Sequence, residues 1–92
     1  MKPVVAVEDS LGNVADYLAA NGFEVRRVKD LRTEARKLEG CKAVVISGLD
    51  RNFAGYAGIK EEVPVIEARG QKPDAILTHV LARTGLAENA IQ

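Results

Sequence analysis

Short apolar runs separated by polar turns predict four strands in this chain. The runs at residues 3–7 and Ala43–Ile46 are continuous, which is typical of parallel strands that are covered on both faces. Residues 23–28 alternate between apolar and charged side chains, as expected for an edge strand that charge protects from pairing with another chain. A fourth strand is predicted at residues 63–67, where Pro64 stands at a position that tolerates a missing N–H.

Three helices are predicted between and after these strands. Ser10 is placed to cap the first, in which apolar residues recur at the three- and four-residue spacing of one buried stripe. Asp30 is placed to cap a second, weaker helix that reaches residue 39. The last helix opens at Pro73 and stops at Gly85, because proline suits a first helical position and glycine a helix end.

Strands and helices alternate along the chain, and such alternation requires a parallel sheet with right-handed crossovers. We therefore predict an α/β fold with an open parallel sheet of four strands, order 2-1-3-4, and helices on both faces, a truncated doubly wound, Rossmann-like arrangement. One domain fills residues 1–85, and residues 86–92 form a loosely held tail. Because the apolar strands are central, four side chains are expected to be almost fully buried: Val5, Val7, Val44 and Ile46.

Composition argues against several kinds of partner. The 92 residues carry 13 basic and 13 acidic side chains, so no net field attracts nucleic acid or an anionic membrane surface. The single cysteine, Cys41, excludes an internal disulfide and suits a reducing compartment. The apolar run near the N-terminus is too short for a signal peptide or a membrane span. These features predict a soluble, cytoplasmic protein.

The carboxyl ends of the predicted strands mark the place where open α/β sheets bind ligands. The loops after the first and third strands meet there, and the helix that follows the first strand points its unpaired N–H groups at the same edge. We predict that the ligand-binding residues lie at this edge and are Glu8, Ser10, Ser47, Gly48, Asp50, Asn52 and Arg69. The alternative is that these residues have only structural roles, as ordinary capping and turn residues.

No nucleotide-binding or catalytic motif accompanies this edge. The patterns GxGxxG and GxxxxGK[ST] are absent, so neither a dinucleotide site nor a cofactor is expected. Cys41 lies at the far end of its strand, and His79 has no second ligand at metal-binding spacing, so both are interpreted as structural or surface residues and no metal site is predicted. The stretch VAVEDS resembles the acidic start of a phosphoacceptor receiver domain, but the third strand ends in Ser47 rather than in an aspartate.

Residues 48–62 connect the third and fourth strands without a helical stripe. Loops of this length in small domains are often functional, and this one holds Phe53 and Tyr56, two of the four aromatic side chains of the chain. They are interpreted either as a cover for the sheet or as a partner surface. Together with Val65 on the fourth strand, an edge on which Pro64 blocks one ladder position, they predict the contact of a homodimer.

Three stretches of the sequence carry a family resemblance: VEDSLGNVADYLAANGFEV, GCKAVVISGLDRNFAG and PVIEARG. Over residues 4 to about 80 the chain resembles the YkuS family of small bacterial proteins of unknown function. The most specific feature is a Gly-x-Asp-x-Asn-x-x-Gly pattern, formed by Gly48, Asp50, Asn52 and Gly55. Asp9 and the tail after Gly85 depart from the family pattern. The resemblance implies a soluble α/β domain and no known activity.

Two functional interpretations remain open. The first is a noncatalytic cytoplasmic α/β module that binds a small ligand or a protein partner at the carboxyl edge of its sheet. The alternative is a small enzyme or a magnesium-dependent phosphoryl-handling domain, in which Asp50 and Glu8 serve as base or metal ligands and Arg69 orients an anionic substrate. The distance between two carboxylates separates these interpretations. The enzyme interpretation requires Glu8 and Asp50 to lie within about 5 Å of each other, so that they can share a cation.

Overall fold

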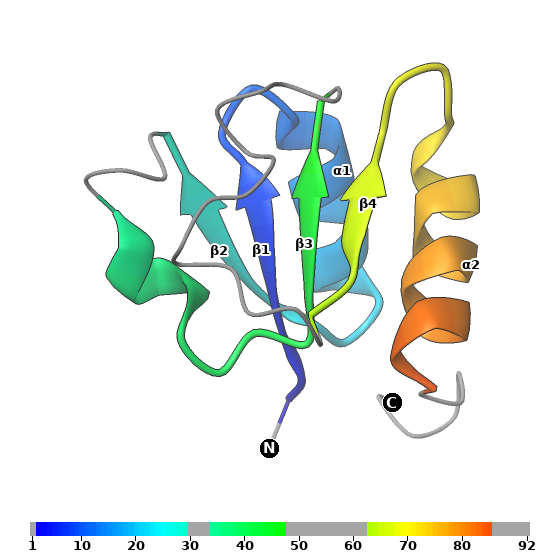
Figure 1. Ribbon diagram of the computed structural model, residues 1–92. Helices are drawn as coiled ribbons and strands as arrows, with labels where there is room; N and C mark the ends of the chain where they lie inside the picture. Colours follow the sequence, from blue (N-terminus) through cyan, green and yellow to red (C-terminus); the bar gives the residue numbers. More distant parts are fainter. Residues whose placement is uncertain (1, 30–33, 48–62, 86–92) are drawn as a thin grey trace.

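A four-stranded parallel sheet forms the centre of the molecule (Figure 1). The computed structural model describes residues 2–29, 34–47 and 63–85. Within them the strand order is β2-β1-β3-β4, and each neighbouring pair is parallel. The strands are β1 (Val4–Glu8), β2 (Glu24–Val28), β3 (Ala43–Ile46) and β4 (Val65–Glu67). The α/β class, the strand order and the parallel pairing predicted from the sequence are therefore confirmed.

The two apolar strands, β1 and β3, are central, as their continuous hydrophobic runs predict. Val5 pairs with Val25 on one side and with Ala43 on the other. The four side chains expected to be almost fully buried have exposed fractions of 0, 0, 3 and 0%, in the order Val5, Val7, Val44 and Ile46. Because both faces of β1 and β3 exclude water, alternating polar positions would leave charges in the interior, and the sequence has none there.

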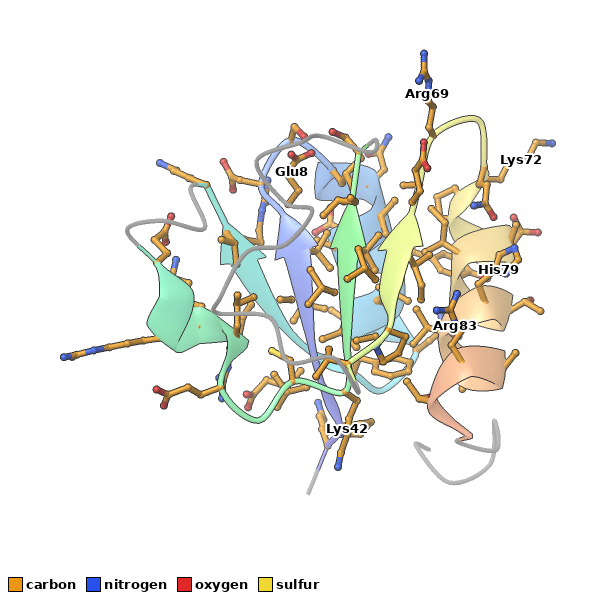
Figure 2. The ribbon with its side chains drawn as sticks, in the orientation of Figure 1. Glu8, Lys42, Arg69, Lys72, His79 and Arg83 are labelled. Carbon is orange, nitrogen blue, oxygen red and sulfur yellow. The ribbon has the colours of Figure 1, made fainter. Side chains whose placement is uncertain are left out.

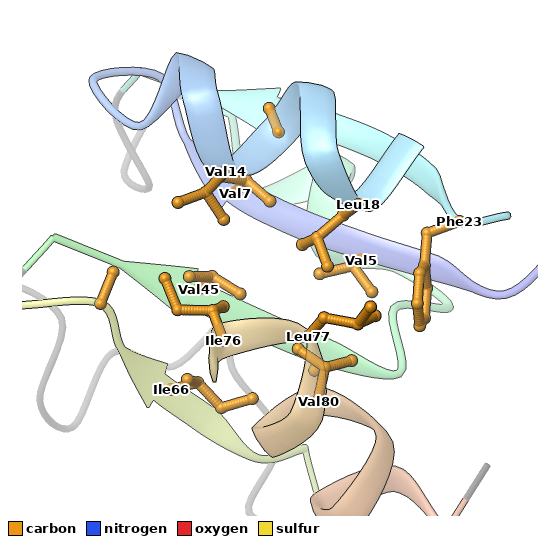
Figure 3. Close-up of a cluster of buried hydrophobic side chains, with 13 residues drawn as sticks. Val5, Val7, Val14, Leu18, Phe23, Val45, Ile66, Ile76, Leu77 and Val80 are labelled. Atoms are coloured by element: carbon orange, nitrogen blue, oxygen red, sulfur yellow. The ribbon is translucent and has the colours of Figure 1, made fainter. Parts of the chain in front are cut away.

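Two helices cover one face of the sheet (Figure 1). They are α1 (Gly12–Ala20) and α2 (Pro73–Thr84), and the stripes that they bury are formed by Val14, Ala15 and Leu18 in α1 and by Ile76, Leu77 and Val80 in α2. These side chains join Phe23 and the inward side chains of the strands in the larger of two hydrophobic clusters (Figure 3). The predicted ends of α2 are confirmed, because Pro73 opens the helix and Gly85 follows it in the left-handed conformation.

The opposite face carries a smaller cluster, to which the 3₁₀ helix η1 (Ala35–Leu38) contributes Leu38. The sequence predicted an α-helix from Asp30 to residue 39, and the described part of that range is 3₁₀ instead; Asp30 itself lies outside the described residues. Leu38 is the one buried side chain among those described at residues 34–39, so little apolar surface stabilises a longer helix here. Arg26 donates to the carbonyl oxygens of Lys37 and Glu39 at the end of η1. Glu39 then leaves the helix with an extended backbone.

One outward backbone group of β2 has a side-chain partner. Lys37 Nζ donates to the carbonyl oxygen of Arg27 at 2.9 Å, and Arg26 reaches the carbonyl oxygen of Glu39 at 2.8 Å, which ties the end of η1 to the strand. Because unpaired backbone groups of an edge strand are a template for further pairing, the Lys37 contact removes one such position. The prediction that this strand lies at the edge of the sheet is confirmed. Among the described residues, no helix is long and apolar enough to cross a membrane.

The fourth strand begins two residues later than predicted. Val63 and Pro64 precede the ladder, which starts at Val65. Pro64 still contacts the sheet, because its carbonyl oxygen accepts a hydrogen bond from the Val44 N–H at 3.0 Å. A proline has no N–H to return to β3, so pairing at this position is one-sided and the regular strand starts at the next residue.

Candidate functional site

The Glu8 carboxylate joins the loops that leave the two central strands. Glu8 is the last residue of β1, and its Oε2 atom accepts hydrogen bonds from the Ser10 hydroxyl at 2.8 Å and from the Ser47 backbone N–H at 3.0 Å. Ser47 follows β3 directly, so this carboxylate connects positions 39 residues apart in the chain. We refer to Glu8, Ser10 and Ser47 as the β1/β3 edge; Glu8 is labelled in Figure 2.

Backbone geometry rather than a side-chain cap starts the helix behind this edge. The Leu11 N–H donates to the Glu8 carbonyl oxygen at 2.9 Å, and α1 begins at Gly12 with Leu11 as its capping residue and no side-chain cap hydrogen bond. The prediction that Ser10 caps this helix is therefore wrong. Ser10 lies one residue too early for that role, and its hydroxyl group is turned to the Glu8 carboxylate instead.

The next acid along the chain, Asp9, has a different partner. Asp9 Oδ1 lies 2.9 Å from Nε of Arg27, and the Asp9 carbonyl oxygen accepts a second hydrogen bond from the same guanidinium at 2.7 Å. Asp9 N–H also donates to the carbonyl oxygen of Val28. Glu8 and Asp9 are thus engaged in separate networks, on the β3 side and on the β2 side of β1. Their carboxylates do not form the paired acidic site that the resemblance to a receiver domain implies.

Arg27 is the residue near this edge that the sequence analysis missed as a contributor. The sequence pattern indicated only that it is one of the charged side chains of an edge strand, whereas its guanidinium also lies beside the start of α1. A Cβ atom added to Gly12 would meet Arg27 Nη2 at 3.4 Å. The parallel register, which pairs Val7 with Arg27, places Arg27 next to the end of β1, and no sequence pattern gives that register.

Of the seven predicted ligand-binding residues, the structure brings three together, and they form the β1/β3 edge. Arg69 follows β4 at the same end of the sheet but is exposed and points away from it (Figure 2). The remaining three, Gly48, Asp50 and Asn52, lie outside the described residues, as do Phe53 and Tyr56 of the predicted interface. Within the described ranges, no group of three or more histidine, cysteine, aspartate or glutamate side chains is placed to hold a metal ion.

The two other residues with reactive side chains lie away from this edge. Cys41 is buried at the entrance of β3, and its thiol donates to the carbonyl oxygen of Lys37 at 3.2 Å. Burial raises the pKa of Cys41, and the nearby Arg26 charge only partly offsets this. A thiol with a raised pKa is a poor nucleophile at neutral pH. His79 is exposed on the surface of α2.

The fold and this edge together define a small open α/β domain, and sequence comparison places the domain in a family. Residues 3–83 match the model of UPF0180, an uncharacterised protein family, and the chain belongs to it. It is 31% identical over 83 residues to the UPF0180 protein YkuS of Bacillus subtilis, covering 90% of this chain and 98% of that one. It is 40% identical over 76 residues to a UPF0180 protein of Geobacillus kaustophilus, covering 83% and 90%. No solved structure matches the chain at a significant level.

Proposed function

We propose that this protein is a noncatalytic binding module whose ligand-binding site is the β1/β3 edge. The observation that carries the proposal is the state of the Glu8 carboxylate. Both of its hydrogen bonds are accepted by Oε2, and within the described residues no donor contacts Oε1. The carboxylate is held in place by two loops and keeps one oxygen for a third donor.

The ligand class follows from the chemistry of that oxygen. A carboxylate oxygen accepts hydrogen bonds, and it does so most strongly from charged N–H groups. The matching ligand therefore presents an ammonium or guanidinium group, either on a small molecule or on a side chain of a protein partner. The position supports this interpretation, since parallel α/β sheets bind ligands outside the carboxyl ends of their strands.

Titration with simple cations tests the proposal. Putrescine, a primary diamine, and agmatine, an alkylguanidine, are added to 15N-labelled protein while the amide resonances of Ser10 and Ser47 are followed. We expect saturable shifts at both amides. Glu8→Gln should weaken binding about tenfold or more, because a hydrogen bond to a charged group contributes about 1.5–3 kcal/mol, while the Gln carbonyl oxygen still accepts from Ser10 and Ser47.

Asp16→Asn is the matched control. Asp16 lies exposed on α1, and its substitution removes the same charge as Glu8→Gln without touching the β1/β3 edge. An equal loss of affinity in the two variants would mean that the change in net charge, and not the β1/β3 edge, causes the weaker binding. Binding that survives Glu8→Gln unchanged, or the absence of shifts at Ser10 and Ser47 with either cation, would contradict the proposed site.

A further inference from the structure

Along the outer edge of β4, several backbone hydrogen-bonding groups have no partner among the described residues. The Pro64 carbonyl oxygen and the Ala68 N–H bond to β3 at 3.0 and 2.7 Å. The backbone N–H and C=O groups of successive strand residues point to opposite sides of the strand. Those of Ile66 therefore also point to β3, whereas those of Val65 and Glu67 point away from the sheet. Within the part of the chain that the structure describes, the Glu67 carbonyl oxygen accepts from the Gln71 side chain at 2.6 Å, and the Val65 N–H, the Val65 carbonyl and the Glu67 N–H have no partner.

Proline does not defend this edge. From the sequence, Pro64 was expected to block one ladder position of this edge. Because the Pro64 carbonyl group faces β3, the missing N–H of the same residue also lies on the β3 side, and the outward positions at Val65 and Glu67 keep their donors. At the β2 edge, η1 lies beside the strand (Figure 1) and Lys37 Nζ donates to the outward carbonyl oxygen of Arg27. Among the described residues, no side chain donates to the carbonyl oxygen of Val65.

We infer that β4 is the interface of a homodimer in which the β4 strands of two copies pair antiparallel and extend the sheet to eight strands. With the two-fold axis at Ile66, the Val65 N–H of one copy donates to the Glu67 carbonyl of the other, and the Glu67 N–H of that copy donates to the first copy's Val65 carbonyl. The axis repeats both bonds. Every outward group of β4 is then satisfied, which is the self-complementarity that a two-fold interface requires.

A two-fold axis perpendicular to the sheet places the α2 helices of both copies on the same face of the extended sheet. The interface offers only a short strand from each copy, and its affinity is accordingly low.

Sedimentation over a concentration series tests this inference, with variants that separate the Val65 N–H from the Val65 side chain. Val65→Pro removes the outward N–H and leaves the ladder to β3 in place. Val65→Ala shortens the same side chain and keeps the N–H. We expect wild type and Val65→Ala to shift from monomer to dimer between micromolar and millimolar protein, and Val65→Pro to stay monomeric with an unchanged far-ultraviolet circular dichroism spectrum.

Hydrogen exchange on the wild-type protein supplies a readout that needs no variant and stays decisive even where Val65→Pro fails to fold. The amides of Val65 and Glu67 should exchange more slowly at millimolar than at micromolar protein, while the amide of Lys42, which donates to the Val4 carbonyl oxygen within one copy, is unaffected. Three results would each overturn the inference: a wild-type monomer at all concentrations, a folded Val65→Pro variant that dimerises like wild type, or a dimer whose Val65 amide exchanges as fast as in the monomer. The last would place the interface on another surface.

Discussion

Among single residues, Cys41 shows how burial in the core changes the acidity of a side chain. Its thiol is buried, its hydrogen bond is donated to a carbonyl oxygen of η1, and loss of water raises its pKa above the ordinary value of 9.0. The thiol therefore remains protonated in the folded protein at a pH where it ionises in the unfolded chain. Its contribution is to the smaller hydrophobic cluster, not to a reaction.

The raised pKa of Cys41 predicts a loss of stability in alkali. As the pH rises above about 9, the unfolded chain releases the Cys41 proton before the folded one does, so the free energy of unfolding falls. Cys41→Ala lacks this group, so the stability difference between wild type and variant should shrink from about pH 8 to about pH 10, as measured by urea unfolding. A constant difference over this range would contradict it. The native thiol should also react more slowly with a disulfide reagent than the urea-unfolded one.

At the level of elements, two glycines at helix ends have opposite requirements. Gly85 ends α2 with a φ of +73° and nothing within 4 Å of an added Cβ, so Gly85→Ala should lower the free energy of unfolding by about 1–2 kcal/mol through backbone strain alone. Gly12 lies in α1 and meets only the flexible end of Arg27. Gly12→Ala should therefore be neutral or stabilise by up to about 1 kcal/mol. Equal losses in both variants, measured by urea unfolding, would contradict this difference.

Most elements were predictable because the apolar periodicity alone defines them. The continuous runs at β1 and β3 fixed the centre of the sheet, and the stripe ending at Gly85 fixed α2. The predictions that failed depend on packing and pairing that the local pattern does not show. η1 stays one short 3₁₀ turn because Leu38 is its one described side chain in the core, and β4 starts late because Pro64 cannot complete its pairing with β3.

In the candidate site too, some residues could be predicted from the local sequence pattern and others could not. Glu8 and Ser47 were predictable because both lie where an apolar strand ends, and parallel strands end at one edge of the sheet. The actual partner of the Ser10 hydroxyl was not, because a serine near a helix start suits either a cap or a neighbouring carboxylate, and a shift of one residue in the helix start decides between them. Arg27 lies near this site because the pairing register of β1 and β2 places it there. No local sequence pattern predicts that register.

At the scale of the whole molecule, one sheet belongs to both hydrophobic clusters. Val45 faces the larger cluster under α1 and α2, and its neighbour Val44 faces the smaller one with Leu38 and Cys41. Loss of either cluster exposes the strands that hold the other in place. We therefore expect cooperative unfolding of the described core, as is usual for single domains of this size.

Leu18→Ala tests that cooperativity. Leu18 is fully buried between α1 and the sheet, so its truncation should cost about 2–5 kcal/mol, a large part of the roughly 5–15 kcal/mol that stabilises a typical domain. Leu81→Ala, at a partly buried position on the same cluster, should cost less. In urea followed by NMR, the native amide signals of Val44 and Val45 should disappear together in both variants, at a lower concentration in Leu18→Ala. If Val45 lost its signal while Val44 remained native, the two faces of the sheet would be independent units and the shared strands would not couple them.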